Sequence, residues 1–479
     1  MNKIAKNYIY NLAYQLLILV IPLITTPYVS RTLGAKGIGI FSYTNSIVQY
    51  FILFGCIGLN LYGQREIAYV QHDNEKKDTV FWELVVLRII TVSVALLVYT
   101  FTVAASGKYV GIFRIMSLDI LASMVDISWL FQGMEECKKI VVRNLIVKII
   151  SVILIFGFVK TATDLWLYIL FQSGASILGN LSMWLYVPGL VKKRNFKSLN
   201  VSRHIKPTIV LFLPQIATSV YMVLDKTMIG LLTDSAEEVA YYEQAQKIVK
   251  LVLALATSLG TVMLPRVANL FKLKAEKQIK EYLNTSFRLT SFLAIPMLFG
   301  LIAISCNLVP WFFGEGYDRV IPNMMIISPI LFFISWSNII GMQYLLPTAR
   351  QREYTASVIV GCCVNFILNL LFISAFASIG ASVATVIAEG SVTFFQIYFT
   401  RNDFNYTEII KSNVNYIYSS IVMLVVIYPL ARFLTPTFMH TCICVLCGAI
   451  IYIGGLWILK DEEIARLRET ILSVIKHCM

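Results

Sequence analysis

The chain has 479 residues, of which 58% are hydrophobic and 14% charged, and its formal net charge is +13. This composition, with a mean hydropathy of +0.73, excludes an ordinary soluble protein, in which about a quarter of the residues are charged. Apolar runs of about 20 residues recur along the whole chain and predict a helical protein that crosses a membrane many times. The sequence lacks the alternating strands of about ten residues that a membrane β-barrel would need.

The apolar runs predict an all-α polytopic membrane protein of about 14 transmembrane helices. The first segment, MNKIAKNYIYNL, leads directly into a full-length span without a small-residue cleavage site, so we expect a retained helix and not a signal peptide. The expected spans are 9–29, 38–60, 81–104, 110–131, 142–160, 164–187, 208–231, 240–264, 284–305, 321–345, 354–375, 379–400, 411–432 and 437–459.

The basic residues fall mainly in alternate connections between these spans. The other set of connections contains only Arg31, Lys36, Lys108, Lys160, Arg319 and Arg432. Because cytoplasmic loops carry the excess of Lys and Arg, both termini are predicted to be cytoplasmic. This alternation requires an even number of spans, and it leaves twelve and fourteen both open. Topology thereby explains most of the positive charge, and no nucleic-acid partner is expected.

A weak internal repeat relates the two halves of the chain. Shifting the sequence by 201 positions lays Arg65 on Arg266, each at the cytoplasmic end of a helix that starts with an aromatic residue. We therefore expect a six-helix lobe over 1–200, a second six-helix lobe over 201–402, and two additional helices with a cytoplasmic tail over 403–479. Because each half has an even number of spans, the repeats would be parallel and would surround a central cavity.

Two consecutive spans carry charges at a depth where charge is costly. Asp225 and Lys226 lie well inside the seventh span. The next helix carries three charges on one face, namely Glu243, Lys247 and Lys250. Facing lipid, each charge would cost about 2.5–3.5 kcal/mol, so we expect these side chains to face protein or water. If the two helices are antiparallel neighbours, Asp225 and Lys247 lie at similar depth.

Further charged residues lie inside the spans, among them Arg88, Asp126 and Glu389. These three either line the same cavity or form structural ion pairs between helices, and the sequence leaves both interpretations open. The excess of cations favours an anionic substrate, of which phosphate is the common biological choice. Asp225 could equally belong to an ion- or proton-coupling site. Glu83 is close enough to a span end that we expect its carboxylate to reach water.

Nothing in the sequence indicates an enzyme. It contains neither a glycine-rich phosphate loop nor a cluster of metal ligands, and its nine cysteines match no zinc or redox motif. The connections predicted to be external are too short to form a catalytic domain. We expect no cofactor, and coupling to a proton or sodium gradient would supply the energy in place of ATP.

Short sequence motifs recur at the ends of the expected spans. The stretch ITTPYVSRTLGAKGIGIFSYTNSIVQYF contains the end of the first expected span and most of the second. The first span ends in Pro-Tyr, an Arg and Leu-Gly follow, and Gly-x-Gly precedes the aromatic start of the second helix. Further motifs occupy 64–68, 126–135, 224–230 and 264–266. Together they resemble the Wzx-like polysaccharide flippases of bacteria, in the multidrug/oligosaccharidyl-lipid/polysaccharide (MOP) exporter superfamily. The resemblance covers essentially the whole chain.

This resemblance implies two six-helix lobes around a central cavity that works by alternating access. A protein of this kind would carry undecaprenyl-diphosphate-linked oligosaccharide repeat units across the bacterial cytoplasmic membrane, for capsule or O-antigen assembly. Its partners would be that lipid-linked oligosaccharide, membrane lipid, and the polysaccharide polymerase and other assembly proteins. By analogy, the last two helices would shelter the polyprenyl tail.

The family function and the charged residues together define a candidate site. The cations expected to bind the diphosphate and the sugars are Arg31, Arg88, Lys226, Lys247 and Lys250. The carboxylates expected to act in coupling or gating are Asp126, Asp225, Glu243 and Glu389. Arg31 matches the family position at the outer end of the first helix, although a plain interfacial anchor explains it equally well.

Three other functions compete with this interpretation. A cation-coupled multidrug antiporter of the same superfamily would favour carboxylates over cations in its cavity. A peptidoglycan lipid-precursor flippase has the same charge requirements, and only the motifs distinguish it. A polytopic polysaccharide polymerase would place a large polar loop outside the membrane, and the short external connections disfavour it.

Overall fold

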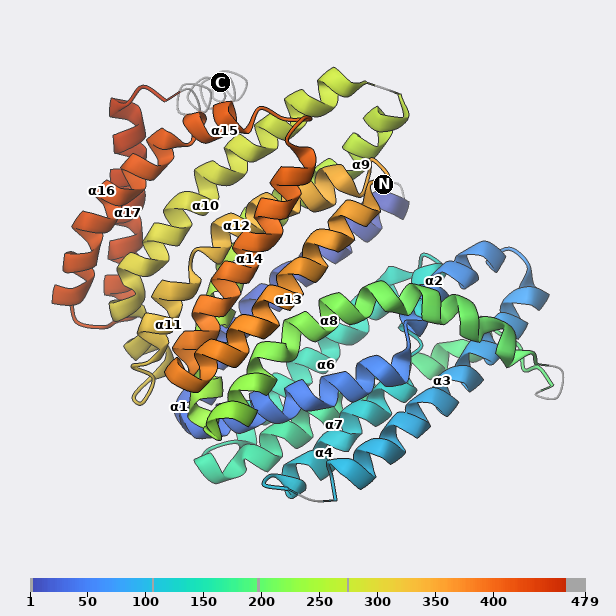
Figure 1. Cartoon of the computed structure of the whole chain (residues 1–479). Coiled ribbons are helices and arrows are strands. Elements are labelled where there is room, and N and C mark those ends of the chain that lie inside the picture. The colour runs from blue at the N-terminus through green and yellow to red at the C-terminus, as the bar shows by residue number, and fades with distance from the viewer. Residues whose placement is uncertain (1–2, 106, 196–198, 274, 462–479) are drawn as a thin grey trace, which may run out of the picture. The chain divides into compact units, whose positions relative to one another are not determined.

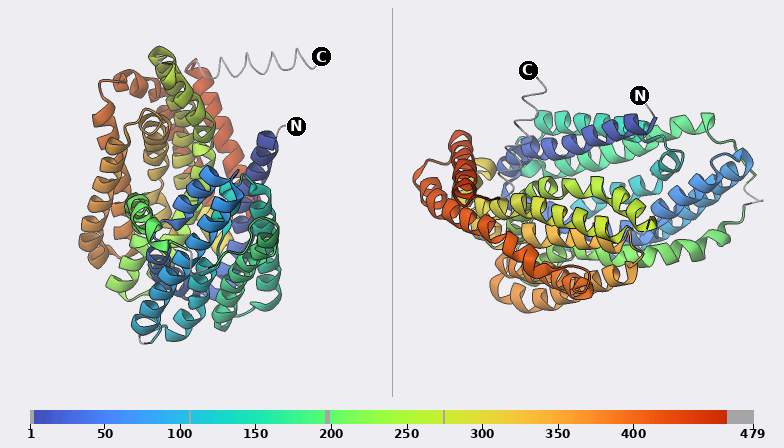
Figure 2. Two further views of the ribbon diagram at one scale, coloured as in Figure 1. Left: turned by 90° about the vertical axis from the view of Figure 1, so that its right-hand side faces the viewer. Right: turned by 90° about the horizontal axis from the view of Figure 1, so that it is seen from above.

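The computed structural model describes residues 3–105, 107–195, 199–273 and 275–461, and within these ranges it contains helices and no strand. Figures 1 and 2 show helices throughout the described part. Contacts divide the chain into two compact units, Met1–Ala240 and Tyr241–Met479. The division into lobes at residue 200, predicted from the sequence repeat, stays a prediction.

The N-terminal unit consists of eight α-helices and short 3₁₀ segments, and the first residues of α9. Its elements are α1 (Lys3–Cys56), α2 (Leu59–Val70), α3 (Asn74–Thr102), α4 (Val110–Met124), α5 (Ser128–Gly133), α6 (Cys137–Phe158), η1 (Ala162–Asp164), α7 (Leu165–Met183), η2 (Trp184–Gly189), η4 (Val201–His204) and α8 (Ile205–Thr233).

The C-terminal unit takes over within α9 (Ala236–Lys272). It continues with α10 (Glu276–Phe313), α11 (Val320–Ile327), α12 (Ile330–Ser337), the π-helix η5 (Asn338–Leu345), α13 (Gln351–Phe376), α14 (Ser378–Thr400), α15 (Tyr406–Ser412), α16 (Val414–Phe433) and α17 (Phe438–Ile458).

All the expected spans lie on helices. In the part of the chain that the structure describes, nine helices are long and apolar enough to cross a membrane. The first two expected spans, 9–29 and 38–60, lie largely in α1, which is interrupted at Gly34. The helical class is therefore confirmed, whereas the count of fourteen and the cytoplasmic placement of both termini stay predictions.

Gly34 makes the interruption of α1 possible. Its backbone adopts φ 68° and ψ 174°, a conformation that only glycine adopts without strain. The chain changes direction at this kink between two helical halves, and the second half of α1 packs along α8.

The second half of α1 touches the end of α8 and the start of α9 along a seam that contains small residues. A Cβ atom added to Gly39 would lie 1.6 Å from the backbone oxygen of Ala236, and one added to Gly230 would lie 2.1 Å from the ring of Tyr43. Closer to the middle of the helices, the Thr227 hydroxyl donates a hydrogen bond of 2.8 Å to the Ser46 hydroxyl. Small side chains permit this approach of two helices, as they do in membrane bundles generally.

The opposite end of the N-terminal unit has an aromatic core. Phe81, Trp129 and Phe131 are fully buried there, where α2, α3 and α5 meet. The Trp184 indole donates a hydrogen bond of 2.8 Å to the Val125 carbonyl, so η2 is fixed to the end of α4. This core holds α3 in register with α4, which matters for the polar residues between them.

The last two helices, α16 and α17, are fixed to α10. The buried Asn307 amide donates to three carbonyl oxygens around the end of α16, those of Ala431, Leu434 and Thr435, at 3.1–3.2 Å. Trp311 on α10 donates a hydrogen bond of 2.6 Å to the Thr441 hydroxyl of α17. The additional helices are thus an integral part of the C-terminal unit.

Candidate functional site

The N-terminal unit contains a polar cavity of about 360 Å³ between α1, α3, α4 and α7. Side-chain amides, hydroxyls and two carboxylates form most of its wall. Its lining residues are Phe41, Asn45, Gln49, Ile52, Cys56, Asn60, Arg88, Asp119, Ala122, Ser123, Asp126, Gln172, Ser173, Ser176 and Asn180. Two of the predicted site residues, Arg88 and Asp126, are therefore brought together in one cavity.

Arg88 on α3 is 2% exposed, and its guanidinium group is engaged by the protein on all sides. Nε donates to the Ser123 carbonyl at 2.6 Å, and one terminal nitrogen donates to the Asn60 side-chain oxygen at 2.7 Å. The other terminal nitrogen lies 3.4 Å from the Cys56 sulfur and 3.7 Å from the Asp126 carboxylate. Five donors in a fixed fork suit this use of Arg88 to join α1, α2, α3 and α4.

The two carboxylates of the cavity lie on the α4 side. Asp126 is the counter-ion of Arg88 and also accepts a hydrogen bond of 2.9 Å from the backbone N–H of Ser128, which begins α5. Asp119 accepts a hydrogen bond of 2.8 Å from the Ser173 hydroxyl of α7. The cavity thus contains one cation and two carboxylates that ionise at neutral pH when exposed to water.

Amide and hydroxyl groups make the opposite wall. Asn180 donates a hydrogen bond of 2.7 Å to the Ala122 carbonyl and accepts one from Arg143. Gln49 donates to the Asn45 side-chain oxygen at 3.4 Å on α1. On α7, Gln172, Ser176 and Asn180 recur every four residues and so share one helical face.

The sequence contains a signal for the α7 part of this wall. An i, i+4 series of polar residues in the otherwise apolar span 164–187 predicts a helix face that turns away from lipid. The prediction from sequence considered only charged residues and therefore missed Asn60, Gln172 and Asn180.

A second cavity, of about 370 Å³, lies between α1 and α8. It shares Gln49, Ile52, Cys56 and Asn60 with the first, so the two lie on either side of the same stretch of α1 and the start of α2. Its other lining residues are Tyr50, Leu53, Gly58, Gln215, Ser219, Met222 and Val223. The α1–α8 pair is therefore in close contact near Gly39 and separated near Gln49.

The charged pair predicted at the centre of the seventh span lies on α8. Asp225 is 5% exposed and Lys226 is half-buried, so both are withdrawn from the surface as expected. They belong to the N-terminal unit, whereas Lys247 belongs to the C-terminal unit. The proximity expected for Asp225 and Lys247 stays a prediction.

In the C-terminal unit, a chain of hydrogen bonds joins the predicted cation Lys250 to α14. Lys250 Nζ donates to the Gln246 side-chain oxygen at 2.9 Å, and the Gln246 nitrogen donates to the Tyr242 hydroxyl at 2.9 Å. That hydroxyl lies 2.9 Å from the Thr385 hydroxyl on α14. The chain orients the ammonium group of Lys250 through two turns of α9.

The remaining predicted residues are distributed over three helices. Glu243 and Lys247 are half-buried on α9, and Glu389 is half-buried on α14, one turn from Thr385. Arg31 is exposed near the interruption of α1 and does not line either N-terminal cavity. The structure therefore groups Arg88 with Asp126, and Lys250 with the α9–α14 network.

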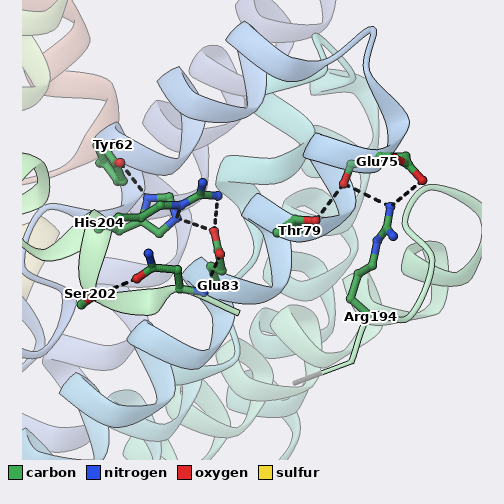
Figure 3. Close-up of polar contacts among 9 residues, drawn as sticks. Tyr62, Glu75, Thr79, Glu83, Arg194, Ser202 and His204 are labelled. Carbon is green, nitrogen blue, oxygen red and sulfur yellow. Dashed lines mark hydrogen bonds and ion pairs between the residues drawn. The ribbon is translucent and has the colours of Figure 1, made fainter. Parts of the chain in front are cut away.

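One prediction about a charged residue is wrong. Glu83 does not extend to water but is 1% exposed, because its carboxylate binds the segment that leads into α8. It accepts a hydrogen bond of 2.7 Å from the Asn200 N–H, lies 2.8 Å from His204 Nε2, and pairs with Arg203. Figure 3 shows His204 between Glu83 and the Tyr62 hydroxyl, which is 2.7 Å from Nδ1.

The C-terminal unit has a third cavity, of about 390 Å³, whose wall is almost entirely apolar. It lies between α9, α10, α16 and α17. Its lining residues are Val252, Phe292, Leu293, Pro296, Met297, Gly300, Leu301, Ala303, Ile304, Met423, Ile427, Cys444, Val445, Gly448, Ala449, Tyr452 and Ile453.

Comparison with known proteins gives the family. The family model described as "Polysaccharide biosynthesis protein" matches residues 4–271, more than half of the chain. The chain belongs to this polysaccharide biosynthesis protein family. A second model, described as "Lipid II flippase MurJ", matches residues 142–447. The resemblance to Wzx-like flippases of the MOP superfamily is therefore confirmed, and the chain is a multi-pass membrane transporter of this family.

Two bacterial relatives extend over most of the chain. A protein of Escherichia coli (strain K12) named "Putative O-antigen transporter" is 26% identical over 405 residues, 83% of this chain and 97% of the relative. A protein of Shigella dysenteriae with the same name is 23% identical and covers 78% of this chain and 94% of its own length. The match thus includes nearly the full length of both relatives and about four fifths of this chain.

Solved structures confirm the fold of this family member. The lipid II flippase MurJ in an inward closed conformation superposes with a TM-score of 0.77 at 18% identity, over 95% of this chain and 100% of that chain. An inward-facing multidrug resistance MATE transporter of the MOP superfamily superposes with a TM-score of 0.64 at 12% identity, over 84% and 99% of the two chains.

Proposed function

We propose that this protein is a flippase that carries undecaprenyl-diphosphate-linked oligosaccharide repeat units across the bacterial cytoplasmic membrane by alternating access. The transported units would serve assembly of a capsule or an O-antigen-type polysaccharide. Family membership and the names of the E. coli and S. dysenteriae relatives support a lipid-linked polysaccharide as substrate. The function therefore requires that one chain accept both a polar headgroup and a long apolar tail.

The observation that carries this proposal is the presence of both kinds of cavity in one chain. Polar cavities of about 360 and 370 Å³ lie in the N-terminal unit, and an apolar cavity of about 390 Å³ lies in the C-terminal unit. Burying polar groups among membrane spans is costly, so the polar cavities of the N-terminal unit support a polar cargo.

The apolar cavity is the proposed site of the polyprenyl tail. Its walls come from α9 and α10 on one side and from α16 and α17 on the other. Asn307 and Trp311 fix the last two helices to α10, so this wall is held in place within the unit. An isoprenoid chain leaves lipid at little cost when apolar side chains take the place of the surrounding lipid. A small difference in free energy suits a site that must both bind and release the tail.

The diphosphate is assigned to the four predicted cations that do not line the cavity around Arg88. These are Arg31, Lys226, Lys247 and Lys250. Lysine binds phosphate as a mobile point charge, and three lysines allow the headgroup to move between partners. We assign coupling or gating to Asp126, Asp225, Glu243 and Glu389, with a proton or sodium gradient as the source of energy.

The α1–α8 pair supplies a geometric basis for alternating access. With the predicted topology, the seam around Gly39 and Ala236 lies toward the outer face, and the cavity around Gln49 and Ser219 lies toward the cytoplasm. Interfaces of small residues can separate without leaving charged groups unpaired. We propose that this seam opens when the substrate is released outward.

A complementation experiment tests the function. Deletion of the gene in its host should trap lipid-linked repeat units in the inner leaflet and abolish the surface polysaccharide. The wild-type gene and the control Lys411→Ala, at an exposed position, should restore the polymer, whereas Lys247→Ala should not. Intact surface polysaccharide in the deletion strain, with new sensitivity to cationic dyes, would favour a multidrug antiporter and refute the flippase.

The MurJ match keeps a second candidate function in view. Because that family model covers residues 142–447, the cargo could be the lipid-linked peptidoglycan precursor. Expression of this chain in cells depleted of their own precursor flippase separates the two: continued growth would assign the peptidoglycan precursor, and lysis would leave the polysaccharide unit as the cargo.

A further inference from the structure

The polar cavity of the N-terminal unit binds the sugar part of the substrate, we propose, and not its diphosphate. Specifically, the cavity formed by α1, α3, α4 and α7 takes the sugar residue attached to the diphosphate, and that sugar is uncharged. This inference rests on the proposed flippase function. It assigns to the cavity a ligand class different from the one that the cationic excess of the whole chain suggests.

The charges of the cavity disfavour a phosphate ligand. Its one cation, Arg88, already contacts the Ser123 carbonyl, the Asn60 amide and the Asp126 carboxylate. The cavity also contains Asp119, so its formal charge is negative when both carboxylates are ionised. A phosphate placed there would meet two carboxylates and would have to compete for a guanidinium group that is 2% exposed.

The neutral side chains of the cavity suit sugar hydroxyls instead. A hydroxyl both donates and accepts, and so does a carboxamide, whose NH₂ donates while its oxygen accepts. The cavity offers five carboxamides and, besides Ser123, two serine hydroxyls. One of the carboxamides, that of Asn60, is already bound to Arg88. These residues are Asn45, Gln49, Asn60, Gln172, Asn180, Ser173 and Ser176. Phe41 adds an apolar ring, against which the C–H face of a sugar can lie.

The cavity wall is preorganised by the protein around it. Asn180 is held by hydrogen bonds with Ala122 and Arg143, and Ser173 by one with Asp119. Arg88 joins the surrounding helices α1, α2, α3 and α4. Fixed donors and acceptors lower the entropic cost of binding. The volume of about 360 Å³ lies near the lower end of the range for small-molecule sites, which suits one sugar residue and not a whole repeat unit.

Gln172 is the residue with which to test this assignment. It is half-buried on α7 and lines the cavity. Its side-chain carboxamide makes no hydrogen bond within the described ranges of the chain. Its side chain is therefore available to a ligand and is not needed for the network around Arg88. Ser176, one turn further on, is exposed and lines the cavity; its hydroxyl donates a hydrogen bond of 3.0 Å to the Gln172 backbone carbonyl, and its oxygen can still accept one from a ligand.

The experiment measures binding to the purified full-length protein in detergent by calorimetry. The two probes are farnesyl diphosphate and farnesyl diphosphate linked to N-acetylglucosamine. In the wild-type protein the sugar should raise the affinity. Gln172→Leu and Ser176→Ala should each weaken binding of the sugar-bearing probe, by roughly tenfold and threefold, because a lost hydrogen bond leaves a polar group unpaired. Their affinity for farnesyl diphosphate should not change.

Gln351→Leu is the matched control, since it makes the same chemical change at an exposed position on α13. Thermal unfolding of each variant shows that the fold is kept. Equal loss of affinity for both probes would place the diphosphate in the cavity and overturn the proposal, as would unchanged affinity for the sugar-bearing probe. Failure of the wild-type protein to bind either probe would instead refute the proposed function.

Discussion

Lys108 and Asp234 form an ion pair, with 2.9 Å between Lys108 Nζ and the carboxylate, that joins the connection before α4 to the turn between α8 and α9. Asp234 adopts a left-handed conformation with φ 49° at the end of α8, and Lys108 Nζ also lies 3.3 Å from its carbonyl oxygen. The lysine therefore satisfies a helix-terminal carbonyl as well as a carboxylate. With the predicted topology, this pair lies on the outer face beside the α1–α8 seam.

The first prediction concerns the pH dependence and reversal of this pair. The hydrogen bond to Asp234 raises the pKa of Lys108 above its ordinary value of 10.5. The contribution of the pair is thus fully present below 10.5 and is lost as the pH rises through the raised pKa of the folded state. Near neutral pH the pair should stay intact, so transport should not depend on its titration. Lys108→Glu should shift the equilibrium between the closed and the open seam toward the open state. For an exposed pair we expect a change of roughly twofold in this equilibrium.

Labelling of a cysteine within the seam measures this effect. Ser46→Cys places a thiol at the Thr227 contact, and a membrane-impermeant maleimide reaches it only when the outer side is open. Lys108→Glu should raise the labelling rate, and Lys108→Glu combined with Asp234→Lys should restore it. An unchanged rate in the single variant would show that the pair has no part in closure.

The second prediction concerns packing at the seam. Gly39→Ala would put a Cβ atom 1.6 Å from the Ala236 oxygen, so α1 must move away from the start of α9 at the seam to accept it. We expect a loss of about 1–3 kcal/mol in the free energy of unfolding, the range for overpacked interiors. Gly111→Ala in α4, where a Cβ atom meets open space, is the control and should leave stability unchanged or slightly higher. Equal midpoints of thermal unfolding would contradict the close contact.

The sequence predicts the helices well because the bilayer determines their length and apolarity. Every backbone polar group must be satisfied within a span, so hydropathy alone locates the segments that include α3 and α13. The face of α9 that carries Glu243 and Lys247 was also recognisable, because helical periodicity brings residues four apart together. These features depend on local sequence only.

The convergence of polar residues from different helices was not predictable in this way. Asp119 and Ser173 are 54 positions apart, and their hydrogen bond follows from the packing of α4 on α7. The position of Glu83 near a span end predicts a carboxylate in water, yet Asn200 and His204, on a segment 117 or more positions later, enclose it. A single sequence carries no periodic signal for such contacts.

The third prediction follows from the contacts of Arg88. Arg88→Ala should lower the free energy of unfolding by about 2–4 kcal/mol, because it removes a buried side chain with its hydrogen bonds to Ser123 and Asn60 and leaves the half-buried Asp126 carboxylate without its counter-ion. Arg88→Lys should recover only part of this loss, since an ammonium group cannot reach Ser123, Asn60 and Asp126 together. Unfolding by a denaturing detergent measures the difference.

Arg432→Ala, which removes an exposed arginine near the end of α16, is the control for these variants and should have little effect. Combining Arg88→Leu with Asp126→Asn should restore stability relative to Arg88→Ala, because both charges are then removed. If Arg88→Ala were as stable as the wild type, the guanidinium group would not be the joint between α1, α2, α3 and α4.

The fourth prediction concerns the buried cluster of Glu83, Arg203 and His204. Glu83→Ala removes the acceptor of the Asn200 N–H and of the two basic side chains, so the segment before α8 should detach from α3. Limited proteolysis of the connection between α7 and α8 should become several times faster. Glu75→Ala is the control: its side chain is 88% exposed beside Arg194, and its loss should leave the proteolysis rate unchanged. Similar rates for both variants would contradict the anchoring role of Glu83.

The fifth prediction tests the apolar cavity as the tail site. Gly300 lines it from α10, and a Cβ atom there would touch only the end of Met423, at 3.8 Å, so a larger side chain can enter the cavity without displacing backbone.

Gly300→Phe should fill this volume and leave thermal stability nearly unchanged. A polyprenyl tail that passes from detergent or lipid into the cavity gains packing contacts and no transfer energy from water, so exclusion of the tail should weaken binding severalfold. Binding of undecaprenyl diphosphate should therefore fall in Gly300→Phe, while Gly157→Phe, at an open position on α6, should bind like the wild type. Equal affinities would place the tail outside this cavity and leave α16 and α17 with a purely structural role.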